Sequence, residues 1–254
     1  MSTSNKIIHI VSFNIPYPPD YGGVMDVFYK IRALKKEGIG VILHCFTYGR
    51  SRSKSLENEC LRVHYYKRNL NLFLFLKREP FIVSSRADEK LLTDLTEDNY
   101  PILFEGLHTT AYLTNLSLDG RMTIVRTHNI EHLYYSNLAS VEKNLFRKLF
   151  FRLEALKLER YEPKLSKASL LLPISPSDTD YYMSRYGKAL FVGPFHDPDT
   201  CMSLTGKGKY ILLHGDFSTP ENNSAALYLV REVIPAWKYS TIIAGKKPSP
   251  QLMH

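Results

Sequence analysis

The chain has 254 residues, of which 44% are hydrophobic and 23% are charged, and its formal net charge is +8. This composition is typical of a globular protein whose core is large enough to fold without metal or disulfide support. Its three cysteines (Cys45, Cys60 and Cys201) lie far apart without a Cys-x-x-Cys pair, which indicates free thiols in a reducing compartment.

The positive charge favours an anionic partner, such as a phosphate-bearing substrate or a membrane surface; a basic surface without a role is the alternative. We expect no nucleic-acid partner, because the sequence has no zinc-finger spacing or other nucleic-acid signature. The apolar run of residues 7–13 is interrupted by His9 and is too short and polar for a signal peptide or a membrane span. We therefore expect a cytoplasmic protein that can rest peripherally on the inner membrane face.

The first part of the chain predicts a βαβ unit. Residues 6–13 predict a buried strand, residues 14–23 a loop rich in proline and glycine, residues 24–37 a helix and residues 39–46 a second strand. Gly22 and Gly23 precede the helix, where a ligand can approach the backbone closely and an anion can meet free N–H groups. The sequence is not Gly-x-Gly-x-x-Gly and no Gly-Lys-Ser/Thr follows, so the dinucleotide and P-loop hypotheses lose support, and a glycine turn without a ligand is the rival interpretation.

Polar residues follow several of the next predicted strands. Glu105 follows the strand predicted for residues 100–104, His128 and Asn129 follow residues 121–127, and Ser175 follows residues 168–174. The carboxyl ends of parallel strands meet at one edge of a sheet, so these positions and the glycine pair converge. Such an edge suits a polyol or phosphate ligand. Residues 51–59 predict a loop, residues 61–66 a strand, and the apolar residues 70–76 a core or interfacial helix.

Residues 141–167 give the longest helical pattern, with Leu145, Leu149, Leu153 and Leu156 at steps of three and four residues. We expect a helix that packs on the core and has a charged solvated face. A basic amphipathic helix that lies on an anionic membrane is the alternative. Ser175 and Pro176 then predict the start of a further helix, which Gly187 ends.

A second βαβ pattern follows a stretch rich in glycine and proline. Residues 210–214 predict a strand, Thr219 a helix cap, residues 220–234 a helix and residues 240–244 a strand. We therefore expect an α/β fold with three parts. A Rossmann-like domain of parallel strands flanked by helices occupies residues 1–192, a linker residues 193–208, and an incomplete second Rossmann-like segment residues 209–254.

The stretch His128-x-x-Glu131-His132 matches a short zinc-protease motif. Both histidines would have to lie one turn apart on one helix, but His128 follows a strand too closely, and Asn129 is a better N-cap than an interior residue. No third ligand is evident. We therefore expect no metal, and a zinc hydrolase is the last of the hypotheses.

Several motifs together resemble a known family. They are Asp20-Tyr21-Gly22-Gly23, Phe104-Glu105-Gly106-Leu107, residues 126–132, Ser175 with Asp178, and His214-Gly215-Asp216-Phe217 with Pro220-Glu221-Asn222-Asn223. With these motifs in this order, the chain resembles the GT-B-fold retaining glycosyltransferases of family 4, in particular bacterial versions, over nearly its whole length.

The resemblance implies two Rossmann-like domains, of which the first binds mainly the acceptor and the second mainly a nucleotide-sugar donor. It implies sugar transfer with retention, without an obligatory metal or cofactor, to a cell-surface glycan or a lipid-linked acceptor. His128 is then the catalytic residue near the transferring sugar. The substrate-binding residues are Gly22, Gly23, Glu105, Asn129, Glu131, Ser175 and Gly215.

The sequence departs from this family in its last part. Residues 209–254 contain no Glu-x7-Glu segment and no counterpart of the family's donor-binding lysine or arginine. We therefore expect the N-terminal portion of a transferase, truncated in its second domain and inactive by itself. A non-catalytic binding module that keeps half of the fold is the alternative.

Overall fold

The computed structural model describes residues 6–197 and 205–253, which belong to two compact units. The first unit comprises Met1–Tyr134 and Glu154–Asp197, and the second comprises Tyr135–Leu153 and Pro198–His254. Part of the predicted linker (residues 198–204, with Cys201) lies outside the described residues.

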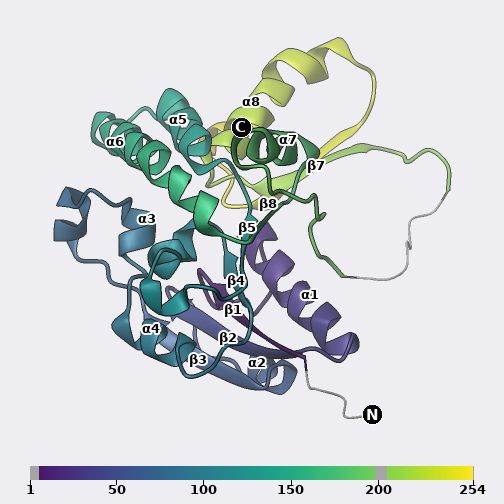
Figure 1. Ribbon diagram of the computed structural model, residues 1–254. Coiled ribbons are helices and arrows are strands. Elements are labelled where there is room, and N and C mark those ends of the chain that lie inside the picture. The colour runs from purple at the N-terminus through teal and green to yellow at the C-terminus, as the bar shows by residue number, and fades with distance from the viewer. Residues whose placement is uncertain (1–5, 198–204, 254) are drawn as a thin grey trace. The chain divides into compact units, whose positions relative to one another are not determined.

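The first unit is built on one sheet of six parallel strands in the order β3-β2-β1-β4-β5-β6 (Figure 1). This Rossmann-like order confirms the predicted fold class. The order reverses between β1 and β4, and ligands of open α/β sheets bind beside the carboxyl ends of the strands at such a point. The strands are β1 (Ile7–Ser12), β2 (Gly40–Thr47), β3 (Arg62–Lys67), β4 (Ile102–Glu105), β5 (Thr123–Thr127) and β6 (Leu170–Pro173).

Helices connect these strands, and two of them differ from the sequence prediction. Helix α1 (Gly22–Lys36) begins at the glycine pair, whereas the sequence predicts a loop up to Gly23. Residues 51–59 are not all loop, because they include α2 (Lys54–Glu59). The other connections are η1 (Leu72–Leu76), α3 (Phe81–Ser84), α4 (Glu89–Leu95), η2 (Leu107–Tyr112), η3 (Leu116–Leu118), α5 (Glu131–Val141), α6 (Leu145–Tyr161), η4 (Glu162–Lys167) and α7 (Pro176–Tyr186), where η marks a 3₁₀ helix.

The apolar core lies between the sheet and α1. Alternate residues of a strand point to one face, and residues three or four apart share one face of a helix, so both elements present an apolar surface to the other. Burying each such side chain contributes about 1.5–3 kcal/mol. The cluster includes Ile10 of β1, Leu43 of β2, and Val27, Phe28 and Ile31 of α1.

The opposite alternation carries a buried polar network. His9 Nδ1 and His44 Nε2 are 2.8 Å apart, His44 Nδ1 lies 2.7 Å from the Tyr66 hydroxyl, and that hydroxyl donates to Asp94 of α4 at 2.7 Å. Burial lowers the pKa of His44 well below its ordinary value. The network ties β1, β2 and β3 to α4, which explains why polar residues interrupt strands that are otherwise apolar.

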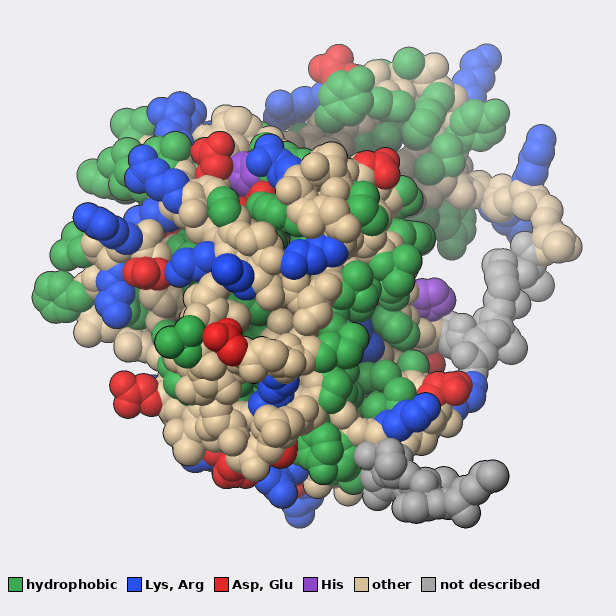
Figure 2. All heavy atoms as spheres, in the orientation of Figure 1, with side chains coloured by type: hydrophobic (Ala, Val, Ile, Leu, Met, Phe, Trp, Pro, Cys, Tyr) green, Lys and Arg blue, Asp and Glu red, His purple; other side chains and the backbone are tan. Residues whose placement is uncertain are grey.

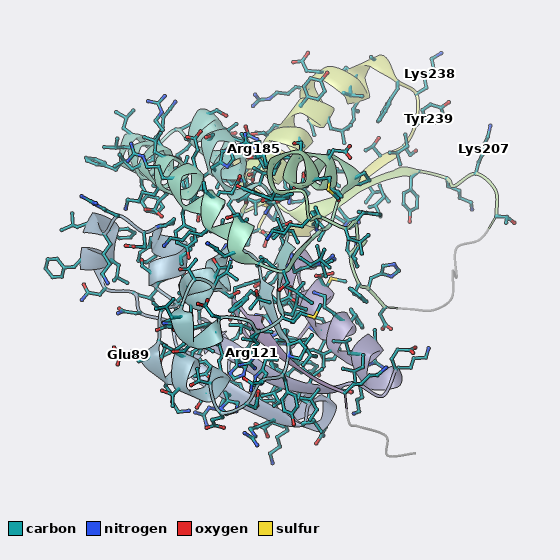
Figure 3. All side chains as sticks on the ribbon, in the orientation of Figure 1. Glu89, Arg121, Arg185, Lys207, Lys238 and Tyr239 are labelled. Atoms are coloured by element: carbon teal, nitrogen blue, oxygen red, sulfur yellow. The ribbon has the colours of Figure 1, made fainter. Side chains whose placement is uncertain are left out.

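Two neighbours complete this network. Arg121, labelled in Figure 3, donates to Asp98 at 3.0 Å, and Asp98 in turn accepts from His9 at 2.9 Å.

Ligand atoms of His44, His64 and Asp94 lie within 4.8 Å of one another. Asp94 nevertheless already accepts from Lys90 at 2.7 Å as well as from Tyr66, so the protein's own donors hold this cluster together.

Helix α6 does not pack as we expected. Its buried residues are Glu154, Ala155, Leu158 and Tyr161, whereas Leu145, Leu149, Leu153 and Leu156 are each at least half exposed. At 100° per residue the two sets lie on opposite sides of the helix. The carboxylate of Glu154 determines the buried side, because it accepts the Phe81 N–H at 2.6 Å. The leucine stripe therefore faces away from the core.

The segment of residues 70–76 also lies mostly outside the core. It forms η1, in which Leu74 is buried while Leu72, Phe73 and Leu76 are exposed. No helix in the described part of the chain has the length and apolar character needed to cross a membrane.

The second unit contains a two-stranded parallel sheet of β7 (Ile211–Asp216) and β8 (Thr241–Lys246), joined through α8 (Pro220–Tyr228). This is the predicted βαβ pattern. The predicted cap is wrong in detail, because the Thr219 hydroxyl donates to the Asp216 carbonyl and caps no helix N–H. Shorter helices complete the unit: η5, a π-helix (Leu229–Val233), η6 (Ile234–Ala236) and η7 (Pro250–Leu252).

The start of α7 agrees with its sequence signature. Ser175 Oγ accepts the N–H of Asp178 at 3.2 Å, Pro176 occupies the first helical position, and the helix ends before Gly187. The hydroxyl of Ser175 is thus used to satisfy a helix terminus.

We predict that Ser175→Ala lowers the free energy of unfolding by about 1 kcal/mol, because it removes this cap. Chemical denaturation at neutral pH measures the change. Ser184→Ala is the matched control, since its exposed hydroxyl lies on the same helix and donates to the Tyr181 carbonyl at 2.9 Å. Equal losses in the two variants would contradict a capping role.

Candidate functional site

A pocket of about 460 Å³ lies beside the carboxyl ends of β1, β4 and β5 in the first unit. This is the sheet edge at which the sequence predicted a ligand, and the pocket collects residues from segments far apart in the chain. Its lining consists of Phe13, Tyr21, Gly22, Gly23, Asp26, His108, His128, Asn129, Glu131, Tyr134, Ile174 and Pro194.

The amino terminus of α1 forms one side of this pocket. The N-cap residue, Tyr21, makes no side-chain cap hydrogen bond, so the first-turn N–H groups at Gly22 and Gly23 have no side-chain acceptor there. A Cβ on Gly23 would come within 2.9 Å of the Phe13 ring, so only glycine allows this ring to pack against the helix start. Free N–H groups and the positive end of the helix dipole favour an anion at this position.

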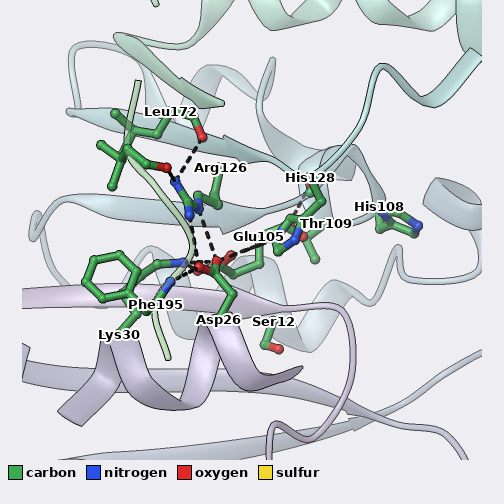
Figure 4. A network of polar contacts seen from close by, with 12 residues as sticks. Ser12, Asp26, Lys30, Glu105, His108, Thr109, Arg126, His128, Leu172 and Phe195 are labelled. Carbon is green, nitrogen blue, oxygen red and sulfur yellow. Dashed lines mark hydrogen bonds and ion pairs between the residues drawn. The ribbon is translucent and has the colours of Figure 1, made fainter. Parts of the chain in front are cut away.

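A buried ion network lies against the first turns of α1 (Figure 4). Asp26 of α1 accepts from the guanidinium of Arg126 at 2.9 and 3.1 Å, from Lys30 Nζ at 2.9 Å and from the backbone N–H of Phe195 at 2.8 Å. Arg126 also donates to the carbonyl of Gly193 at 3.0 Å. The network joins α1, β5 and the chain after residue 192.

Lys30 connects this network to a second carboxylate. Its Nζ donates to Glu105 at 2.6 Å, and the other oxygen of Glu105 lies 3.2 Å from His128 Nε2. A carboxylate can only accept, so His128 carries its proton on Nε2 in this contact. Glu105 is fully buried, whereas the side chain of His128 is 13% exposed and reaches the pocket.

The two carboxylates are held in the ionised form. Burial would raise the pKa of Asp26, but Lys30, Arg126 and the Phe195 N–H together hold it well below its ordinary value. Burial would likewise raise the pKa of Glu105, but Lys30 and His128 hold it below its ordinary value. The ring of His128 is therefore oriented by a negative charge.

Ligand atoms of Asp26, Glu105 and His128 lie within 4.8 Å of one another. The cations of Lys30 and Arg126 already occupy their carboxylate oxygens, so the charge that would attract a metal is compensated. The two histidines of the predicted zinc motif have different partners. His132 Nδ1 lies 3.0 Å from Glu162, whereas His128 precedes α5 and contacts Glu105.

A second histidine and carboxyl pair lines the pocket. His108 Nδ1 and Glu131 Oε1 are 3.8 Å apart, and neither atom has a hydrogen-bond partner among the described residues. Figure 4 shows His108 apart from the ion network. Gly106, at φ 72°, makes room for it, since a Cβ there would lie 2.8 Å from His108 Nδ1.

This second pair is uncharged. Burial raises the pKa of Glu131 to about 8, although Asn129 and Arg86 act in the opposite direction. Burial also lowers the pKa of His108 well below its ordinary value. The Phe13 ring lies between the two pairs, with centroids 5.6 Å from His108 and 5.7 Å from His128. The pocket thus presents one charged and one neutral pair on either side of an aromatic ring.

The structure brings most of the predicted site residues together. Five of them line the pocket, namely Gly22, Gly23, His128, Asn129 and Glu131. Glu105 is buried behind the pocket and accepts a hydrogen bond from His128. The N-cap prediction for Asn129 is wrong, because α5 begins at Glu131 and its first bond runs from Tyr134 to the Ile130 carbonyl.

Two predicted residues lie elsewhere. Ser175 caps α7 and does not line the described pocket. Gly215 lies near the carboxyl end of β7 in the second unit.

Sequence reasoning missed Asp26, Lys30, Arg126 and His108. A signal existed for the first three. Asp26 and Lys30 are one turn apart within an apolar helix, and Arg126 interrupts a strand predicted to be buried. Buried charges are rare unless they are paired, so three of them in buried elements predict partners.

The fold resembles that of known proteins, although no family model matches the sequence. Two solved structures of glycosyltransferases with the GT-B fold share the architecture. One is UGT71G1 of Medicago truncatula complexed with UDP-glucose, with a TM-score of 0.53 and 9% identity over 97% of this chain and 68% of that chain. The other is sucrose-phosphate synthase of Thermosynechococcus elongatus, with a TM-score of 0.54 and 13% identity over 96% of this chain and 71% of that chain. At these identities the likeness defines the fold class alone.

A closer likeness in sequence is to an uncharacterized 44.6 kDa protein in the cps region of Klebsiella pneumoniae. The two are 31% identical over 247 residues, which is 91% of this chain and 61% of the relative. The chain therefore spans about three fifths of the length of this relative.

We predict opposite effects for two buried glutamates of the site. Glu131→Gln removes a group whose folded-state pKa is raised, so the stability that the proton provides is present below pH 4.5 and lost as the pH rises through about 8. The variant should therefore gain on the wild type between pH 5 and 8, by on the order of 4 kcal/mol at pH 8.

Glu105→Gln is the matched comparison. The pKa of Glu105 is lowered, so its carboxylate stabilises the fold above its unfolded-state pKa and less as the pH falls. This variant should lose about 3–5 kcal/mol at pH 7, because Lys30 is left with one carboxylate. Urea unfolding of both variants between pH 5 and 8 measures the difference. A pH-independent effect of Glu131→Gln would refute a protonated Glu131.

Proposed function

We propose that this chain forms the acceptor-side part of a glycosyltransferase that transfers a sugar from a nucleotide-sugar to a glycan or a lipid-linked acceptor. The observation that carries the proposal is the pocket at the strand ends, where the uncapped start of α1 lies beside His128. An anion and a reacting hydroxyl group can be held side by side in such a site.

The geometry supports a role for each part. The first-turn N–H groups of α1 bind a phosphate of the donor, because they present partial positive charge without a competing side-chain acceptor. His128 lies at the transferring sugar as the catalytic residue. Glu105 keeps its ring oriented and its proton on Nε2, and the negative charge of Glu105 stabilises positive charge that develops on the ring. Asn129 contributes to the same substrate surface.

The neutral pair supplies a different kind of contact. A protonated carboxyl can donate a hydrogen bond and a neutral imidazole can accept one, so Glu131 and His108 suit sugar hydroxyls better than phosphates. We propose that they hold the sugar or the acceptor, while the α1 terminus holds the anion.

The comparisons and the resemblance support the finer points of the proposal. The cps-region relative favours a role in polysaccharide biosynthesis, and the UDP-glucose complex of the structural neighbour favours a nucleotide-sugar donor. We propose retention of configuration and no metal requirement, as the resemblance to family 4 implies, and a cytoplasmic location, which the scattered cysteines favour. We propose no nucleic-acid partner.

A test of this function does not require knowledge of the substrate. We expect deletion of the gene in its source organism to remove or shorten a surface polysaccharide, and the wild-type gene to restore it. His128→Ala should not restore it, although the variant should still fold, because His128 lies at a strand end and Lys30 still binds the Glu105 carboxylate.

Gel analysis of the polysaccharide and thermal unfolding of the purified variant measure the two effects. Full complementation by His128→Ala would remove His128 from the reaction. A large drop in its melting temperature would instead make His128 a structural residue. An unchanged polysaccharide after gene deletion would contradict the proposed function.

We also propose that the 254-residue chain alone does not transfer sugar. Residues 209–254 lack the donor-binding basic residue and the acidic segment that the resemblance implies. The purified chain should therefore give no labelled product from UDP-, GDP- or dTDP-sugars with lipid-linked or glycan acceptors. Transfer from any of these donors would refute this proposal, and binding of an acceptor without transfer would agree with a binding module.

A further inference from the structure

We propose that the apolar tip formed by Leu72, Phe73 and Leu76 of η1 inserts into the surface of an anionic membrane. These side chains are 73%, 75% and 82% exposed, and all three lie within five residues. The contact of so many large apolar groups with water is unfavourable. They form a surface separate from the pocket.

The tip is held outward by its own anchors. Leu74 is buried, and Phe75 packs its ring against Phe81 of α3 with centroids 4.2 Å apart. Lys157 of α6 donates to the Phe75 carbonyl at 2.7 Å. With Leu74 and Phe75 fixed on the inside, Leu72, Phe73 and Leu76 are left on the outside of the turn. The exposure of the three side chains therefore results from the fixed packing of Leu74 and Phe75.

The charge around the tip favours an anionic membrane as its binding partner. Lys67, Lys77 and Arg78 flank it and are exposed, and within the described residues none of them has an ion-pair partner. The sequence has no Asp or Glu between Leu61 and Arg78, and one exposed acidic residue, Glu79, follows. Apolar side chains with exposed cations on either side in the sequence match the boundary between acyl chains and anionic headgroups, into which such groups insert by about 5–10 Å.

The tip is also a projecting feature and not a groove. Figure 1 shows its short coil to the left of α3, and Figure 2 shows hydrophobic and basic side chains alternating along that edge. A projecting basic tip fits a fluid lipid surface better than it fits a protein partner, which would have to supply a matching apolar cavity.

The position of the tip bears on the acceptor. It follows the carboxyl end of β3, which runs parallel to β1, so it lies at the same edge of the sheet as the pocket. Arg86, which follows α3, donates to the carbonyl of Phe13 in the pocket at 2.9 Å. If the proposed transferase function holds, this placement favours an acceptor carried on a membrane lipid.

Vesicle co-sedimentation of the purified chain tests the proposal. Wild-type protein should bind vesicles of phosphatidylcholine with about one-third phosphatidylglycerol, and bind phosphatidylcholine alone more weakly. The double variant Leu72→Asp/Phe73→Asp should lower the binding by at least about tenfold. Lys77→Glu/Arg78→Glu should lower it mainly at low salt, because exposed charges are screened.

The matched control is Leu116→Asp. Leu116 is 83% exposed on another 3₁₀ helix, η3, which precedes the amino end of β5 and so lies toward the opposite edge of the sheet. It should bind vesicles like the wild type. No binding by the wild type, or equal binding by the double variant, would overturn the proposal. Loss of a dimer in size-exclusion chromatography, without vesicle binding, would assign the tip to a second copy of the chain. None of these readouts depends on sugar transfer.

Discussion

The carboxylate of Asp26 is the interaction on which the first unit depends. It lies one turn into α1 and binds the guanidinium of Arg126, the ammonium of Lys30 and the N–H of Phe195. Each of these charges would be costly alone in the interior, so removal of one leaves the others unpaired. The contacts fix the start of α1 against the carboxyl ends of the strands. The pocket exists where the α1 terminus and these strand ends meet.

Two glutamates at the same sheet edge show how the environment determines chemistry. Glu105 lies between Lys30 and His128 and is ionised, whereas Glu131 faces a neutral His108 and keeps its proton. Both are almost fully buried, so the difference comes from the nearby cations and not from exposure. One edge therefore combines an ionised pair, a neutral pair and the uncapped start of α1, and the α1 start suits the phosphate and the neutral pair the hydroxyl groups of one ligand.

Much of this edge could be predicted from the sequence. The spacing of apolar residues indicated parallel strands, and the carboxyl ends of such strands necessarily meet, which is why Gly22, Glu105 and His128 were found together. The partner of a buried charge could not be predicted in this way. Arg126 and Asp26 are 100 residues apart, and no local pattern encodes that distance. The orientation of α6 was missed for a similar reason. Its apolar stripe is plain in the sequence, but the contact of Glu154 with the Phe81 N–H turns the stripe away from the core.

The sequence by itself determined the α/β class, the alternation of strands and helices, the cap of α7 and the edge at which the candidate site lies. These features depend on periodicity, turn residues and the geometry of parallel sheets, which are local or general. Only the tertiary structure decided that Asp26 pairs with Arg126, that Glu131 is neutral and that Leu72 and Phe73 are exposed. Each of these depends on which groups from distant segments lie within a few ångströms, and on how much water their packing excludes.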